Sequence, residues 1–261
     1  MKPIRIFETH AHYDDKAFDE DRDELLRSLR AEGFDYVINV AADLRGVDAT
    51  LELTREYDHV YGAIGVHPEM VYELNENTFQ HVREVAMKDK MLAVGEIGLD
   101  YHGDEVDKGL QKEWFYRQLE LARELNKPVV IHSRDACEDT MTVLGSREAR
   151  GIKGVMHCYS YTVETARELL KLGYYFGIGG VITFNNAKKL VEAVEEIPLE
   201  RILLETDCPY LAPTPHRGKR NSSLYIPLIA EKIAQIKGIP YYKVLEKTHE
   251  NAKNLFLKGK N

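Results

Sequence analysis

Short apolar segments alternate with amphipathic segments along the whole of this 261-residue chain. The apolar segments are rich in β-branched residues, and this alternation is typical of parallel strands that are buried on both faces and joined by covering helices. One helical stripe, spaced at i, i+3, i+4, i+7 and i+10, consists of Ala187, Leu190, Val191, Val194 and Ile197. We predict eight strands, at residues 4–10, 36–42, 60–66, 91–99, 128–133, 153–159, 174–180 and 201–207.

Eight strand–helix units in 261 residues favour a closed (β/α)8 barrel over an open doubly wound sheet. No G-x-G-x-x-G sequence follows an early strand, and no P-loop lysine follows FGIGG near residue 176, which argues against a nucleotide-phosphate loop. Two closing helices are expected at 222–237 and 240–257, and they are interpreted as cover for the core. We therefore predict one α/β domain over residues 1–261. The apolar face of the first closing helix would hold Ile226, Ile229, Ile233 and Ile236.

Composition narrows the function classes. The net charge is −8, from 35 Lys and Arg against 43 Asp and Glu, which argues against a module that holds duplex nucleic acid by general attraction. Neither a signal-peptide pattern nor an apolar run of roughly 18 residues is present, so no membrane association is expected. The three cysteines, Cys137, Cys158 and Cys208, are far apart and odd in number, which argues against a disulfide framework or zinc ribbon. A reducing, cytoplasmic location is expected.

Ionisable residues gather at the carboxyl ends of the predicted strands. In a barrel these ends converge on one mouth, and the two histidines of "HAH" would share one strand face. Four imidazoles and two carboxylates exceed the needs of one tetrahedral ion, and carboxylates commonly bridge ions in two-metal sites. We therefore expect two divalent ions, with Zn, Mn, Ni and Mg left open. The six residues are His10, His12, Glu96, His132, His157 and Asp207.

Other histidines and cysteines carry no such pattern. Cys158 and Cys208 directly follow His157 and Asp207, so their thiols are expected to point away from the mouth if strand alternation continues. His59, His81 and His249 lie outside the strand ends and are interpreted as surface or structural residues.

Several motifs occur together and in order: ETHAH, VGEIGLDY, VVIHSRDA, HCYSYT, LLETDCPYLAP and RGKRNSS. In combination they resemble the TatD family of metal-dependent deoxyribonucleases, which belongs to the amidohydrolase-like TIM barrels, and the resemblance covers nearly the whole chain. It implies a first ion held by His10, His12, Glu96 and Asp207. It implies a second ion held by Glu96, His132 and His157, with Glu96 bridging. The sequence departs from the expected pattern at Glu8, where an aspartate is expected; we interpret Glu8 as orienting His10.

The site predicts a hydrolase in which Asp207 is the general base and Glu96 joins the ions. DNA is the leading substrate, bound transiently and cleaved at single-stranded ends in an exonuclease-like manner, because no recognition helix or basic stripe is visible. No obligate protein partner is expected. The residues expected to contact substrate are His67, Arg134, Arg217, Lys219 and Arg220.

Three alternatives stay open. A hydrolase of small amides, esters or lactones would use the same ions without needing the RGKRN loop. A deacylase acting on charged tRNA would keep that loop and change the bond that is cleaved. A non-enzymatic metal scaffold is disfavoured, because a structural site is closed by four protein ligands to each ion.

Overall fold

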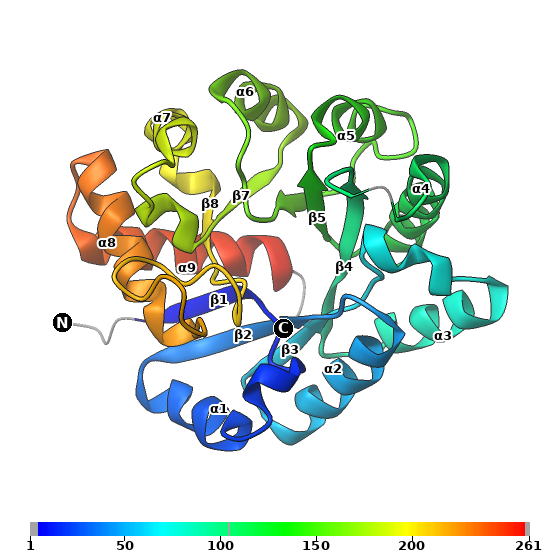
Figure 1. Cartoon of the computed structure of the whole chain (residues 1–261), viewed down its shortest axis with the longest axis horizontal. Coiled ribbons are helices and arrows are strands. Elements are labelled where there is room, and N and C mark those ends of the chain that lie inside the picture. The colour runs from blue at the N-terminus through cyan, green and yellow to red at the C-terminus, as the bar shows by residue number, and fades with distance from the viewer. Residues whose placement is uncertain (1–4, 104, 259–261) are drawn as a thin grey trace.

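Eight parallel strands follow chain order around a barrel, with helices on its outside (Figure 1). The computed structural model describes residues 5–103 and 105–258. It confirms the predicted (β/α)8 architecture. The strands are β1 Ile6–Ala11, β2 Phe34–Val40, β3 Val60–Ala63, β4 Met91–Asp100, β5 Val129–Arg134, β6 Gly154–Met156, β7 Tyr175–Ile178 and β8 Ile202–Leu204. The α-helices are α1 Arg22–Ala31, α2 Leu44–Glu56, α3 Glu76–Ala86, α4 Lys108–Glu124, α5 Cys137–Leu144, α6 Val163–Leu172, α7 Lys188–Glu196, α8 Ile226–Lys237 and α9 Tyr241–Phe256.

The barrel closes between its first and last strands just beyond the end of β8. An isolated parallel bridge joins Ala11 to Cys208, and the N–H of His12 donates to the carbonyl of Cys208 at 2.8 Å. The N–H of Asp207 donates to the carbonyl of His10 at 2.9 Å. Closure therefore places Asp207 directly beside His10, which lies in β1, and His12, which follows β1.

Strand ends differ from the sequence-based boundaries where the backbone leaves the extended region. The predicted first strand begins at residue 4, which lies outside the described residues. The strands predicted at 153–159 and 201–207 are three residues each, β6 and β8. Cys158 has φ 45° and Asp207 has φ 58°, values that interrupt a strand. The metal-ligand candidates His157 and Asp207 thus lie in the turns after their strands.

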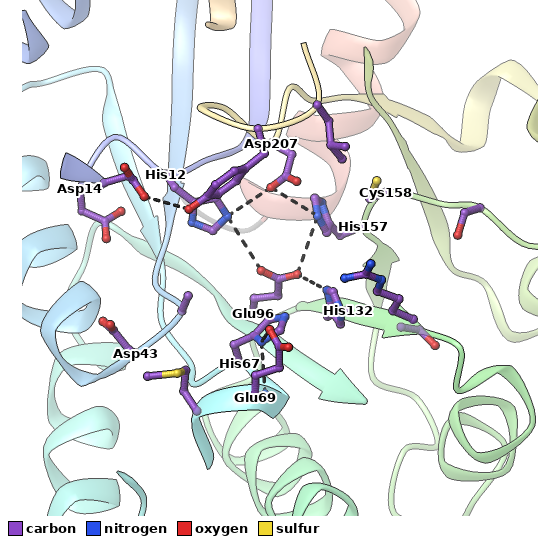
Figure 2. Close-up of a pocket in the computed structure, with 18 of the residues that line it drawn as sticks. His12, Asp14, Asp43, His67, Glu69, Glu96, His132, His157, Cys158 and Asp207 are labelled. Carbon is purple, nitrogen blue, oxygen red and sulfur yellow. Dashed lines mark hydrogen bonds and ion pairs between the residues drawn. The ribbon is translucent and has the colours of Figure 1, made fainter. Parts of the chain in front are cut away.

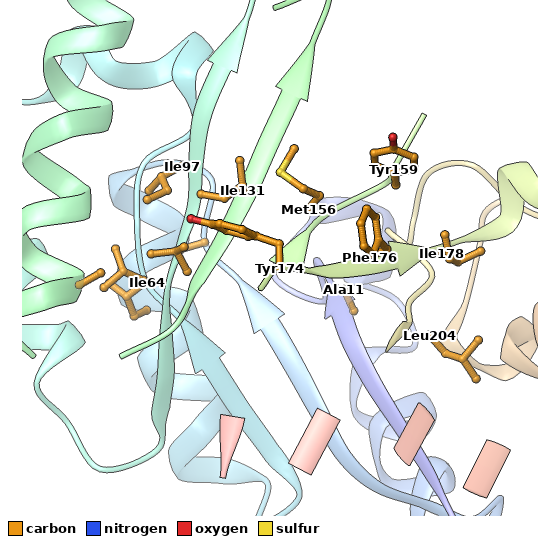
Figure 3. Close-up of a cluster of buried hydrophobic side chains, with 14 of the residues drawn as sticks. Ala11, Ile64, Ile97, Ile131, Met156, Tyr159, Tyr174, Phe176, Ile178 and Leu204 are labelled. Carbon is orange, nitrogen blue, oxygen red and sulfur yellow. The ribbon is translucent and has the colours of Figure 1, made fainter. Parts of the chain in front are cut away.

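Apolar side chains form two clusters, and their arrangement explains where polar groups can lie. The larger cluster includes Ile97, Ile131 and Phe176, and part of it is shown in Figure 3. The second cluster includes Val130 and Val155 together with residues of α9. Because strand side chains alternate, His132 shares a face with Val130, and the chain continues in the same direction from Val155 to His157. This face therefore changes from apolar to polar towards the carboxyl ends of the strands.

The two closing helices cover the core as predicted, but the first of them, α8, starts later than predicted. Residues Ser223–Tyr225 form a 3₁₀ turn, and α8 begins only at Ile226. Ile226, Ile229 and Ile233 are fully buried, whereas Ile236 is half-buried. No helix in the described part of the chain is long and apolar enough to span a membrane.

Candidate metal centre

A cavity of about 680 Å³ opens at the carboxyl ends of the strands. His12, Glu96, His132, His157 and Asp207 line this cavity (Figure 2). His10, the sixth predicted ligand, is fully buried and contacts the group through its Nε2 atom. The structure therefore brings all six residues together.

One half of the group has the spacing of ligands to a single ion. The Nε2 atom of His12 lies 3.1 Å from Nε2 of His10 and 3.3 Å from Oδ1 of Asp207. His10 Nε2 lies 3.5 Å from Oε2 of Glu96. Ligand atoms about 2.0–2.2 Å from one ion, at angles of about 90–110°, lie roughly 2.8–3.6 Å apart. These three separations fit a common divalent ion, and the two other pairs are slightly longer, at 3.7 Å from His10 Nε2 to Asp207 Oδ1 and 4.0 Å from His12 Nε2 to Glu96 Oε2.

The tautomer of His12 also fits metal binding. Its Nδ1 atom lies 2.8 Å from the carbonyl oxygen of Val40. A carbonyl only accepts, so Nδ1 carries the hydrogen and Nε2 can direct a lone pair towards the group.

The other half of the group surrounds the second oxygen of Glu96. His132 Nδ1 lies 2.8 Å from Glu96 Oε1, and His157 Nε2 lies 3.7 Å from the same oxygen. Figure 2 shows Glu96 at the centre, with imidazoles on different sides of its carboxylate. Its two oxygens thus face two different pairs of histidines, as a carboxylate that bridges two ions requires.

A glycine lets β4 approach β5 closely at this point. Gly98 has φ 146°, and a Cβ atom there would lie 2.0 Å from the carbonyl oxygen of His132. No other residue type fits this approach without displacing the backbone. Gly98 therefore allows Glu96 and His132 to meet from adjacent strands.

The electrostatics of the group attract positive charge. Burial raises the pKa of Glu96, but the imidazoles of His157 and His10 outweigh it and hold that pKa well below its ordinary value. Burial lowers the pKa of His12, but bonding to Asp207 outweighs it and raises the pKa to about 9. Burial also lowers the pKa of His132, but the carboxylates of Asp100 and Glu96 outweigh it and raise that pKa to about 9. The pKa of His10, in contrast, is lowered by burial and by the nearby His157. The carboxylates that draw protons onto His12 and His132 are a suitable environment for divalent cations.

The predicted substrate contacts divide into two sets. Arg134 and His67 line the cavity, and His67 Nδ1 also accepts a hydrogen bond from the N–H of Glu69 at 3.2 Å. Arg217, Lys219 and Arg220 are not among the residues that line it.

Two cations of the RGKRN loop have other partners. Arg220 pairs with both carboxylate oxygens of Asp21, at 2.6 and 2.5 Å. The guanidinium of Arg217 lies 4.2 Å from the ring centroid of Phe184. Arg220 is therefore held against the segment between β1 and α1, and substrate contact by Arg217, Lys219 and Arg220 stays a prediction.

Several cavity residues were not identified from the sequence. Arg45 adds a cation, and the wall also carries Asp14, Asp15, Asp43 and Glu69. The expectation for Cys158 is wrong: Cys158 lines the cavity, because its positive φ ends the strand alternation on which that expectation rested. Cys208 is fully buried, as expected for a packing residue.

Two missed carboxylates lie behind the histidines. Asp100 Oδ2 is 2.8 Å from His132 Nε2, and Glu205 Oε1 is 3.0 Å from His157 Nδ1. The signal that could have found them is the strand period of two, because Asp100 lies four residues after Glu96 and Glu205 lies two residues before Asp207.

Comparisons with known proteins agree with the motifs. The family model described as "TatD related DNase" matches residues 7–257. The metal-dependent hydrolase YabD of Bacillus subtilis is 42% identical over 96% of this chain and 98% of its own length. The "3'-5' ssDNA/RNA exonuclease TatD" of Escherichia fergusonii is 32% identical over 96% of this chain and 98% of its own. Among solved structures, YjjV, a TatD homologue from Escherichia coli K12, superposes with a TM-score of 0.91 at 28% identity, covering 97% of this chain and 98% of that one.

Proposed function

The chain belongs to the TatD family of metal-dependent hydrolases, and from that membership and the site geometry we propose that it hydrolyses phosphodiester bonds of single-stranded DNA. The observation that carries the proposal is the position of Glu96. Its two oxygens face two different pairs of histidines at the base of a cavity of about 680 Å³.

In this proposal the six residues hold two divalent ions. His10, His12 and Asp207 hold the first ion, His132 and His157 hold the second, and Glu96 binds both. Their imidazole and carboxylate donors suit Zn, Mn or Ni, with Mg also possible through the carboxylates. Such ions would lower the pKa of a water molecule and polarise a phosphoryl oxygen.

Asp207 is the proposed general base. Its side chain keeps 15% exposure, against 4% for Glu96. Its contacts with the imidazoles of His10, His12 and His157 all involve Oδ1. Oδ2 is therefore available to accept the proton of the attacking water and to pass it to the leaving oxygen as the ester bond breaks.

Arg134 is the proposed phosphate contact nearest to the ions. It lines the cavity and follows His132 by two residues, so a guanidinium at this point can pair with a phosphate held over the ligands. Arg45 supplies a second cation to the same cavity. The relative named as a single-stranded DNA and RNA exonuclease supports this substrate class.

The acidic wall favours a second candidate, a hydrolase of small molecules. Asp14, Asp15, Asp43 and Glu69 face the cavity, and this charge opposes the approach of a long polyanion. A small amide, ester or lactone would meet less repulsion, and the ester of a charged tRNA would bring only its end into the pocket.

A parallel activity screen distinguishes these candidates. Protein reconstituted with Mn, Zn, Ni or Mg is given end-labelled single-stranded DNA, the matching duplex, bis-p-nitrophenyl phosphate, charged tRNA, and lactone and amide panels. We expect wild type to shorten single-stranded DNA and a matched Asp207→Asn protein to do so about 10²–10⁴-fold more slowly. Cleavage of lactones, amides or charged tRNA without any phosphodiester cleavage would contradict the proposal.

We also propose a cytoplasmic location. All three cysteines of the chain, Cys137, Cys158 and Cys208, are free thiols, which suits a reducing compartment.

A further inference from the structure

Two of the four site histidines have a buried carboxylate on the nitrogen that faces away from Glu96. His132 Nε2 lies 2.8 Å from Oδ2 of Asp100, and His157 Nδ1 lies 3.0 Å from Oε1 of Glu205. The first is a hydrogen bond, and the second is an ion-pair contact that is not aligned as a hydrogen bond. Asp100 is 3% exposed and Glu205 is 1% exposed, so both carboxylates are shielded from solvent.

The remaining two histidines have a different environment. The outer nitrogen of His12 meets the neutral carbonyl of Val40 at 2.8 Å. The Nδ1 atom of His10 has no hydrogen-bond partner among the described residues. The two halves of the site are therefore unequal, and the carboxylates lie behind the half formed by His132 and His157.

Three hydrogen bonds hold Asp100 in place. Its Oδ1 atom accepts a hydrogen bond from the N–H of His102 at 2.9 Å. The side-chain amide of Gln111 accepts from the N–H of Asp100 at 2.9 Å and donates to its carbonyl at 2.8 Å. Oδ2 is thus directed at His132 by groups that do not belong to the metal site.

Glu205 is held by an equally specific arrangement. Its Oε1 atom accepts a hydrogen bond from the N–H of Cys158 at 2.6 Å. A Cβ atom on Gly177 would lie 2.1 Å from Oε2 of Glu205, so the space taken by this carboxylate exists only because residue 177 has no side chain. Adjacent strands therefore provide a fitted position for a buried negative charge next to His157.

The carboxylates of Asp100 and Glu205 compensate for an unequal distribution of negative charge between the two proposed ions. The first proposed ion receives a carboxylate of its own from Asp207 and shares Glu96. The second has only the shared carboxylate of Glu96 among its direct ligands. With Asp100 and Glu205 included, four carboxylates face two divalent ions. A carboxylate on the outer nitrogen of a ligating histidine fixes the ring and increases its basicity.

We propose that Asp100 and Glu205 are positioning residues that set the affinity of the second ion through His132 and His157. This inference rests on the proposed two-ion site. It predicts that the two ions bind with separable affinities and that these two carboxylates act on only one of them.

The test is a metal titration of the full-length chain, which needs no substrate. Chelator-treated wild type, Asp100→Asn and Glu205→Gln proteins are titrated with Mn²⁺ by calorimetry, and ions per chain are counted by mass spectrometry. We expect each variant to bind the first ion as wild type does and the second about 10–100-fold more weakly. Asp14→Asn is the matched control, because Asp14 lines the same cavity and its side chain hydrogen-bonds Asn39 rather than an imidazole.

The two variants act on different histidines, so a folding failure in one leaves the other as a complete test. Two ions bound with unchanged affinity in a folded variant would overturn the inference, and so would equal weakening of both ions. Direct ligation is the competing interpretation, because His67, Asp100 and His132 offer atoms within 4.8 Å of one another, as do His10, His157 and Glu205. A third ion in wild type that disappears in either variant would establish that interpretation instead. A wild type that binds one ion would contradict the two-ion site itself.

Discussion

Thr206 donates two hydrogen bonds to the buried carboxylate of Glu8, from its N–H to Oε1 at 3.0 Å and from its hydroxyl to Oε2 at 2.6 Å. The two residues are 198 positions apart and join β1 to the segment after β8. Ser223 adds a third bond to Oε2 at 2.9 Å. Glu8 thus joins the first strand to the segment after the last strand, beside His10 and Asp207.

Glu8→Ala should destabilise the protein. Without the carboxylate, the N–H groups of His10 and Thr206 lose their buried acceptor, and each donor left unpaired costs about 1–3 kcal/mol. For a chain of this size each kcal/mol lowers the melting temperature by about 2–4 °C. Thermal unfolding of chelator-treated wild type and variant measures the effect without a contribution from bound ions. Equal melting temperatures would show that Glu8 does not stabilise the closure.

Asp207→Asn should lower kcat far more than it raises KM. An amide can still lie next to the histidines but cannot take a proton from water, and loss of a general base typically costs about 10²–10⁴-fold. Steady-state kinetics on bis-p-nitrophenyl phosphate, with ion content measured on the same samples, separates loss of the base from loss of metal. A change confined to KM would place the base elsewhere.

Arg134→Ala should weaken binding of single-stranded DNA and flatten its salt dependence by roughly 0.7 in the slope of log affinity against log salt. Arg217→Ala should have a smaller effect, because Arg217 lies over Phe184 and outside the cavity lining. Fluorescence anisotropy with a labelled oligonucleotide measures both slopes. The reverse order, with the larger effect in Arg217→Ala, would show that the RGKRN loop holds the DNA backbone.

His59 should contribute to acid sensitivity of the fold. Burial lowers its pKa below the ordinary value of 6.5, and its Nε2 donates to the carbonyl of Leu26 at 3.0 Å. Below pH 6.5 the unfolded chain therefore binds more protons at this residue than the folded chain does, so stability present above that pH is lost as the pH falls. His59→Gln keeps a donor and does not titrate. Its melting temperature should decline less than that of wild type between about pH 7 and pH 5, measured with chelator present; parallel curves would refute this.

The barrel and the meeting of six ligand candidates could be predicted because both follow from periodicity. Strand alternation identifies the polar faces, and closure brings the strand ends together. The same rule failed at Cys158, where a positive φ ends the strand alternation and the residue lines the cavity. The pairing of Arg220 with Asp21 could not be predicted from the sequence either, because the two residues are 199 positions apart and meet only when the barrel closes. Asp100 and Glu205 obey the strand period, but their partners become evident only when adjacent strands are placed side by side.

Glu96→Gln removes the carboxylate that is proposed to join two divalent ions in a hydrolytic site. The substitution keeps the shape of the side chain and removes the negative charge that both imidazole pairs face. Reconstituted wild type and variant are compared for ions per chain and for turnover of bis-p-nitrophenyl phosphate. We predict about two ions per chain in wild type, fewer in the variant, and a fall in kcat of about 10²-fold or more. Two ions per chain with undiminished turnover in Glu96→Gln would contradict the account.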